Sequence, residues 1–184
     1  MMPQSKILVD TNTYLRLARA IRPLLFLEFG EARYCLYILP ELNGELSVRR
    51  LISKFPWVGD EEYVENRQYS PKVAKKKRKE VDNTFEFVWD YVVSDLPGPS
   101  RVDALYVTWA VELSIPVVTD DKDMTLLAEV FGARVMPTLE ILRLMLDCGH
   151  VSLKTVSGLV DYWRYIDDRP ANFHADLKKF FPET

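Results

Sequence analysis

Residues that build disulfide frameworks or histidine-based metal sites are scarce in this sequence. The chain of 184 residues has only two cysteines, Cys35 and Cys148, and two histidines, His150 and His174. The cysteines lie far apart, without the short spacing of zinc ligands, and neither histidine has a partner at ligand spacing. We therefore expect free thiols in a reducing compartment and assign no role to the histidines.

Long apolar runs are missing as well. A membrane-spanning helix needs about 20 consecutive apolar residues, and no segment of this chain approaches that length. Residues 1–6 lead directly into a short apolar segment, without the hydrophobic region or cleavage site of a secretory signal. Hydrophobic residues still make up 48% of the chain, which is enough to bury a core. The sequence thus predicts a folded protein of the cytoplasm that does not enter a membrane.

Charge of one sign does not dominate. The formal net charge is −3, which excludes a strongly basic nucleic-acid-binding protein. Acids gather at Asp120, Asp121 and Asp123, apart from a basic run. That run consists of Lys72, Lys75, Lys76, Lys77, Arg78 and Lys79. Cleavage of a polyanion requires cations for its phosphates and carboxylates for a metal ion. The basic run is therefore a candidate RNA-binding surface, although a solvated helix face would explain it equally well.

The order of apolar segments predicts an α/β fold. Short apolar or branched runs, typical of buried parallel strands, occupy 6–10, 34–39, 115–119 and 133–136. Segments with helical spacing of apolar residues lie at about 14–21, 42–55, 81–93, 101–113, 124–131 and 137–146. This alternation favours a three-layer α/β/α architecture around a mostly parallel sheet.

The remaining segments set the domain organisation. Between 56 and 80 the apolar pattern weakens, and prolines, a glycine and the basic run predict a mobile or loosely helical insertion. Two further helical segments follow at about 153–166 and 172–181. We therefore expect a domain over 1–148 and a C-terminal helical extension over 149–184 that packs on it.

Acidic side chains stand where an open parallel sheet binds its ligands, at the ends of strands and the starts of helices. Asp10 ends the first predicted strand, and Asp120 and Asp121 follow the third. Asp103 lies in the first turn of the helix over 101–113. Because an acid at the end of an apolar strand gains little there without a ligand, Asp10 is the anchor of the candidate site.

Two glutamates extend this acidic set. Glu41 and Glu45 lie four residues apart near the start of a predicted helix and share one face. Acids at helix starts are also ordinary caps, and that explanation fits Asp103, Glu41 or Asp123 taken singly. Close carboxylates raise each other's pKa unless a cation binds them, and hard ions such as Mg²⁺ or Mn²⁺ prefer oxygen ligands. Since such ions activate water and offset charge on a phosphate, the pattern predicts metal-dependent phosphodiester hydrolysis.

Four segments resemble, in order, the motifs of the PIN-domain nuclease family, which includes the VapC-type toxin ribonucleases. Residues 7–12, ILVDTN, are similar to its opening strand, which ends in Asp-Thr-Asn. Residues 40–46, PELNGEL, resemble the second motif, in which a proline opens a helix and Glu-Leu follows. Residues 101–110, RVDALYVTWA, and 116–124, PVVTDDKDM, resemble the third and fourth. Each motif alone is weak, and the ordered set of four is specific.

The resemblance implies a set of metal-site residues. The implied carboxylates are Asp10, Glu45, Asp103 and Asp121, with Asp123 as a fifth candidate. Asn12 and Thr119 would orient the acids through hydrogen bonds. Glu41 remains an alternative to Glu45, and Asp120 to Asp121. Strand alternation would send Asp120 and Asp121 to opposite sides if the strand continued that far.

The implied activity is that of a Mg²⁺- or Mn²⁺-dependent endoribonuclease, the toxin of a toxin–antitoxin pair. Its expected partners are an RNA substrate, a cognate antitoxin protein and a second copy of the chain. The insertion at 56–80 and the C-terminal helices depart from the compact toxins and resemble PIN-like proteins with an extra helical unit. Two alternatives stay open: a PIN-like module that binds RNA or protein without cutting, and a structure-specific DNA nuclease.

Overall fold

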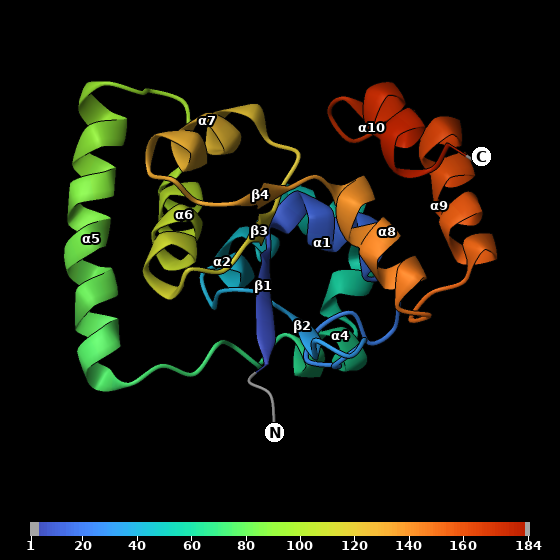
Figure 1. Ribbon diagram of the computed structural model, residues 1–184, viewed down its shortest axis with the longest axis horizontal. Helices are drawn as coiled ribbons and strands as arrows, with labels where there is room; N and C mark the ends of the chain where they lie inside the picture. The colour runs from blue at the N-terminus through green and yellow to red at the C-terminus, as the bar shows by residue number, and fades with distance from the viewer. Residues whose placement is uncertain (1–3, 183–184) are drawn as a thin grey trace.

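A parallel sheet forms the centre of the molecule. The computed structural model describes residues 4–182 and confirms the predicted α/β architecture (Figure 1). The sheet has four parallel strands in the order β2-β1-β3-β4. The strands are β1 (Ser5–Val9), β2 (Tyr34–Tyr37), β3 (Val117–Val118) and β4 (Val135–Met136). Helices flank the sheet, as a three-layer α/β/α fold requires.

The strand β1 lies between two neighbours and sets the register of the sheet. It pairs with β2 over Ser5 to Leu8, and its Val9 lies opposite Val118 of β3. The side chains of Ile7, Leu8 and Val9 are buried, as expected for a strand covered on both faces. Because all strands run in one direction, the residues that follow β1 and β3 emerge at the same edge.

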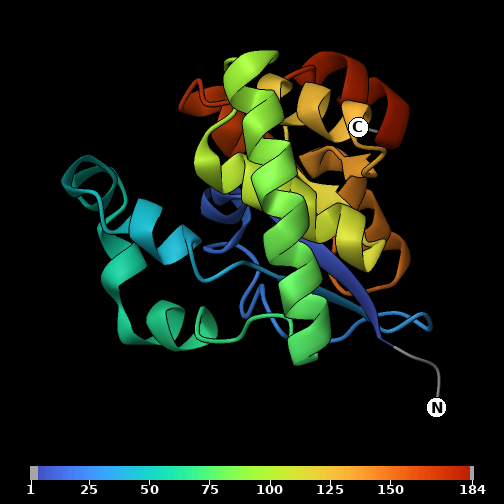
Figure 2. The ribbon, with the colours of Figure 1, turned by 90° about the vertical axis from the view of Figure 1, so that its left-hand side faces the viewer.

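The helices supply the outer layers. In chain order they are α1 (Thr11–Leu17), α2 (Leu42–Leu46), α3 (Arg49–Lys54), a 3-10 turn (Pro56–Gly59), α4 (Glu61–Asn66), α5 (Lys75–Ser94), α6 (Arg101–Leu113), α7 (Lys122–Val130), α8 (Thr138–Asp147), α9 (Leu153–Tyr165) and α10 (Phe173–Phe180). The long α5 packs on α6 at the outside of the molecule (Figures 1 and 2). The C-terminal α9 and α10 pack against α8. Within residues 4–182, no helix is long and apolar enough to cross a membrane.

The predicted helix over 42–55 is instead two short helices. Val48 between them has an extended backbone, and the Ser47 hydroxyl donates a hydrogen bond of 2.7 Å back to the Gly44 carbonyl. The break turns Val48 away from the core, and its side chain is 54% exposed.

The segment over 56–80 is also more ordered than expected. It forms the 3-10 turn, α4 and the first turns of α5, so the helix predicted from residue 81 begins at Lys75. The helix starts earlier than the apolar pattern indicates because lysine, arginine and glutamate are good helix formers in their own right.

Candidate active site

A cleft of about 970 Å³ opens at the edge of the sheet where β1 and β3 end. Its lining comes from α1, α2, α3 and α9, from the start of α6, and from Asp121, which precedes α7. The carboxylates that line it are Asp10, Glu45, Asp103 and Asp121. The cleft therefore brings together the four acids that the motif resemblance implied from four separate segments.

Asp10 is the most buried of these acids, with 5% of its surface exposed. It caps α1: its Oδ1 accepts the Thr13 backbone N–H at 2.7 Å, and its Oδ2 accepts the Thr119 hydroxyl at 2.6 Å. Burial raises the pKa of Asp10 to about 6, against the lowering effect of these bonds, and the charge of Asp120 adds to the rise. A carboxylate that is fixed in place and poorly solvated is one that a bound cation would stabilise.

The Thr119 hydroxyl joins the acids that follow β1 and β3. It donates to Asp10 and accepts the backbone N–H of Asp121 at 3.0 Å. Because one N–H already points at the Thr119 oxygen, the hydroxyl proton is directed to Asp10. Asn12, the other residue expected to orient an acid, is exposed at the cleft, and its side chain forms no hydrogen bond with a described residue. Its neighbour Thr11, which the motif comparison passed over, donates its hydroxyl to Glu45.

The two glutamates have different surroundings. Glu45 on α2 lines the cleft, whereas Glu41 precedes the helix and does not. The Glu41 Oε2 is buried and has no hydrogen-bond partner among the described residues. Burial raises the pKa of Tyr106 well above its ordinary value, and the charges of Asp10, Glu45 and Glu41 raise it further. Glu45 thus has the better position for the cleft, and Glu41 lies within electrostatic reach of the same tyrosine hydroxyl.

Asp103 combines a structural and an electrostatic role. It forms a capping box with Ser100 at the start of α6, in which its Oδ2 accepts the Ser100 N–H at 2.7 Å. Burial raises the pKa of Asp103, and the charges of Asp121 and Asp123 raise it further. The spacing Ser-x-x-Asp at 100–103 is a sequence signal of this capping arrangement.

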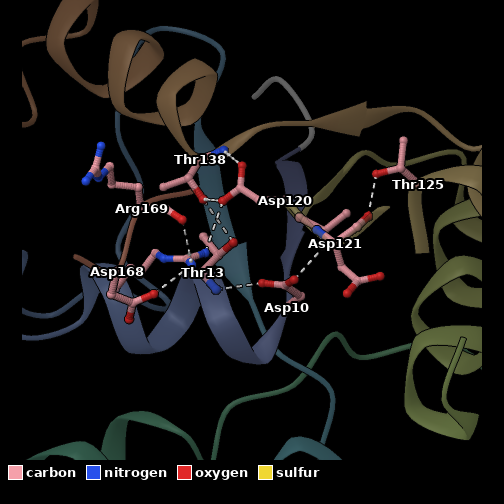
Figure 3. A network of polar contacts seen from close by, with 10 residues as sticks. Asp10, Thr13, Asp120, Asp121, Thr125, Thr138, Asp168 and Arg169 are labelled. Atoms are coloured by element: carbon pink, nitrogen blue, oxygen red, sulfur yellow. Dashed lines mark hydrogen bonds and ion pairs between the residues drawn. The ribbon is translucent and has the colours of Figure 1, made fainter. Parts of the chain in front are cut away.

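Asp120 and Asp121 point to different places, as Figure 3 shows. Asp120 accepts hydrogen bonds from the backbone N–H and the hydroxyl of Thr138, and pairs with Arg16 at 3.4 Å. Asp121 caps α7, where its Oδ1 accepts the Met124 N–H at 2.8 Å, and it lines the cleft. Of these neighbours, Asp121 is placed at the cleft and Asp120 ties the chain to α8.

Asp123, the fifth candidate, lies outside the cleft lining. Its side chain rests against Gly98, where an added Cβ would come within 2.9 Å of the Asp123 Oδ2. A glycine at this position lets the backbone approach the carboxylate closely. Asp123 therefore acts on the cleft through its charge on Asp103.

The basic run lies away from the cleft. Its members from Lys75 onward are in the first turns of α5, on the outer side of α6, and Lys72 precedes that helix. Lys77 bonds Glu112 at 2.7 Å and Glu80 at 3.0 Å, and these bonds raise the pKa of its ammonium group. Arg78 pairs with Asp82 and lies over the Trp109 ring. None of Lys72, Lys75, Lys76, Lys77, Arg78 and Lys79 lines the cleft.

The cations that do line the cleft come from dispersed positions. They are Arg16 and Arg19 at α1, Arg50 and Lys54 on α3, and Lys154 on α9. Except for Arg16, none forms an ion pair with another residue in the described part of the chain. Sequence reasoning missed them because they are isolated charges in separate helices, with no local pattern to single them out.

The donor set suits a hard divalent cation. Four carboxylates share the cleft, and burial and the charges of neighbouring acids raise the pKa of Asp103. In residues 4–182, no three His, Cys, Asp or Glu side chains are already close enough together to hold an ion. Carboxylates repel one another until a cation draws them in, and oxygen-only sites favour Mg²⁺ or Mn²⁺.

Comparisons of the chain with protein-family models, curated proteins and solved structures found no match. An α/β/α fold hosts many unrelated activities, so the function is inferred from the residues of the site. The site offers acids fixed by hydroxyl and backbone donors, four cations that form no ion pair with a described residue, and a cleft of about 970 Å³.

Proposed function

We propose that this chain is a metal-dependent ribonuclease of the PIN type, which hydrolyses phosphodiester bonds in RNA. One observation carries the proposal: Asp10, Glu45, Asp103 and Asp121 line one cleft at the end of a parallel sheet. These acids are far apart in the sequence and come from four motifs. Local capping explains an acid at each helix start, but it does not require all four to face one cavity.

Mg²⁺ or Mn²⁺ would be held by Asp10, Asp103 and Asp121, with Glu45 completing the set, and would activate a water molecule and offset charge on the phosphate. The chain's own residues prepare this site. Thr119 holds Asp10, Thr11 holds Glu45, and Ser100 holds Asp103. These bonds orient the three acids individually, whereas an ion would still have to draw the carboxylates together.

The decisive test is the loss of cleavage in Asp10→Asn. Asparagine caps a helix about as well as aspartate, so the variant keeps the start of α1 and loses the charge. We expect Mn²⁺-dependent cleavage of a labelled RNA to fall below detection. Asp90→Asn on α5 is the matched control, since Asp90 is exposed and lies outside the cleft, and it should cleave like the wild type. Full activity of Asp10→Asn would refute the proposal.

Matched RNA and DNA oligonucleotides then distinguish a ribonuclease from a DNA nuclease, since metal-assisted hydrolysis by itself acts on either. The toxin role, the antitoxin partner and the homodimer are carried by the motif resemblance. Purification of the chain with the product of a neighbouring gene, and the mass of the isolated protein in solution, would test them.

A second candidate function is a nucleic-acid-binding module that does not cut. It is favoured by one observation: Asp10, Asp103 and Asp121 each take part in capping a helix, so each has a structural role without metal. Titration calorimetry with Mn²⁺ separates the two functions. A binding heat that disappears in Asp121→Asn supports the nuclease, and the absence of any heat in the wild type supports the module.

A further inference from the structure

The helix α9 has two contrasting faces. Its inner face is buried through Val156, Leu159, Val160 and Trp163. On the other side, Lys154, Gly158 and Tyr162 recur every four residues, which places them in one row along the helix. All three are exposed, and all three line the cleft that holds the carboxylates. This row is therefore part of the candidate active site, although it lies far beyond the four motifs in sequence.

Gly158 in the middle of this row is unexplained by the fold. Glycine destabilises a helix interior relative to alanine, so it usually has a local reason there. A Cβ added at Gly158 would meet nothing within 4 Å. Neighbouring side chains therefore do not require the absence of a side chain at this position. The space in front of Gly158 belongs to the cleft, and a ligand that passes between Lys154 and Tyr162 would use it.

The charges around this row fit an anionic occupant. Lys154 forms no ion pair within residues 4–182, and neither do Arg50 and Lys54 on α3. Arg50 and Lys54 are four residues apart and both line the cleft, so α3 and α9 each contribute cations to its walls. A chain of phosphates that reaches the acids is complementary to both walls.

Tyr162 favours an unpaired base. It is 52% exposed and lines the cleft, so its ring is accessible to a ligand in the cleft. Aromatic rings bind nucleic acids by stacking on bases, and a base is open to stacking when it is not inside a duplex. The helix is also anchored to the site: Arg16 of α1 donates to Asp168, which follows α9, at 3.2 Å, and to the Arg169 carbonyl at 3.4 Å.

We infer that α9 is a substrate-binding wall, in which Lys154 contacts a phosphate and Tyr162 stacks on a base of single-stranded RNA that passes over Gly158. The inference rests on the proposed function for the identity of the substrate. In this arrangement the C-terminal helix α9 binds substrate directly, and the RNA is bound in the cleft and not by the basic run on α5.

Binding of a fluorescent single-stranded RNA, followed by anisotropy in EDTA so that no cleavage occurs, tests the inference. Tyr162→Ala should weaken binding by about 5- to 100-fold, the usual effect of removing one stacking ring, and Tyr162→Phe should restore it. Tyr165→Ala is the matched control, because Tyr165 is on the same helix, is 87% exposed and does not line the cleft. Equal affinities of Tyr162→Ala and Tyr165→Ala would overturn the inference.

Three further binding measurements test the same inference. Lys154→Ala should lower the slope of log affinity against log salt by about 0.7, the value for one phosphate contact on a single strand, whereas Lys76→Ala on α5 should leave it unchanged. Gly158→Leu should fold, as checked by circular dichroism, and lose affinity by obstruction. A duplex of the same sequence should be insensitive to Tyr162→Ala. A salt slope that responds to Lys76 and not to Lys154, or Gly158→Leu with wild-type affinity, would refute the assignment.

The experiment separates this inference from the proposed function. If the wild type cleaves RNA but the α9 variants bind it normally, α9 is not the wall and the nuclease proposal stands. If the α9 variants lose RNA affinity but the wild type cleaves nothing with Mn²⁺, the wall stands and the nuclease proposal fails. A wild type that binds no single-stranded RNA overturns the inference.

Discussion

Replacement of Asp10 by asparagine should stabilise the metal-free protein at neutral pH. Asp10 is 5% exposed, and burial raises the pKa of its carboxyl from 3.8 to about 6. In the folded state its proton is therefore bound more tightly than in the unfolded chain. Ionisation above about pH 6 must be driven against burial, and this disfavours the folded state. Asparagine is neutral at every pH and carries no such penalty.

The magnitude follows from the two pKa values. Their difference corresponds to about 3 kcal/mol, at about 1.4 kcal/mol for each pH unit. Against this, the asparagine keeps one acceptor for the Thr13 N–H, but it presents an amide N–H to the Thr119 hydroxyl, which at present donates to Asp10. Reversal of that bond costs about 1 kcal/mol. We therefore expect a net stabilisation of about 2 kcal/mol, or about 4–8 °C in Tm for a chain of this size.

The pH dependence gives the effect its signature. Between about pH 4 and pH 6 the folded state binds more protons at Asp10 than the unfolded state does, so the wild type loses stability as pH rises through this window. Asp10→Asn lacks this loss. The free energy of unfolding of Asp10→Asn minus that of the wild type should be near zero or slightly negative at about pH 4, and it should reach its full value above about pH 7.

Urea unfolding followed by circular dichroism, in EDTA and at several pH values, measures these differences. Asp90→Asn is the control for loss of an exposed carboxylate and should stay within about 0.5 kcal/mol of the wild type. Addition of Mn²⁺ at about 100 times its dissociation constant should then stabilise the wild type by about 2.7 kcal/mol and leave Asp10→Asn unchanged. A variant that is less stable than the wild type at neutral pH, or an advantage that does not change with pH, would refute the reasoning.

Two other predictions concern neighbours of Asp10. Thr119→Val removes the hydroxyl between Asp10 and Asp121 and leaves the buried Asp10 carboxylate and the partly buried Asp121 N–H without this partner. The free energy of unfolding should therefore fall by about 1–3 kcal/mol, and Thr119→Ser should restore it. Equal stabilities of Thr119→Val and the wild type in chemical denaturation would contradict the hydroxyl's role. Asp121→Asn should abolish the calorimetric signal of Mn²⁺ binding and change Tm little. Asp120→Asn should keep Mn²⁺ binding but lower Tm, because Asp120 bonds Thr138 and pairs with Arg16. The reverse outcome would make Asp120 the ligand.

Local patterns in the sequence predicted the centre of this fold well. The run at 7–9 is buried as expected, and the helix predicted over 101–113 has those bounds in the structure. These elements have clear periodicity and, for α6, a capping residue that fixes the start. The predicted helix over 42–55 is broken at Val48, whose extended backbone is not indicated by the apolar spacing.

The acids and the cations of the site differ in how far sequence reveals them. The acids follow strands or start helices, so their positions in the sequence indicate one edge of the sheet. Asp120 and Asp121 do point to different places, but β3 ends at Val118, so strand alternation does not set their directions. Cations such as Arg50 and Lys154 reach the cleft only because α3 and α9 pack beside it. A contiguous basic run is conspicuous in sequence, yet the run on α5 faces Glu112 and solvent. Tertiary packing decides which charges meet a substrate.

Capping and metal binding by the acids are compatible duties. Each cap uses one carboxylate oxygen: Oδ1 of Asp10 for Thr13, Oδ2 of Asp103 for Ser100, and Oδ1 of Asp121 for the N–H of α7. A carboxylate has about four acceptor positions, so capacity for a cation remains. The cap also removes the rotamer freedom that an ion would otherwise have to freeze. A helix start is therefore a suitable place for a ligand, and substitution of aspartate by asparagine keeps the cap while it removes the charge that the chemistry needs.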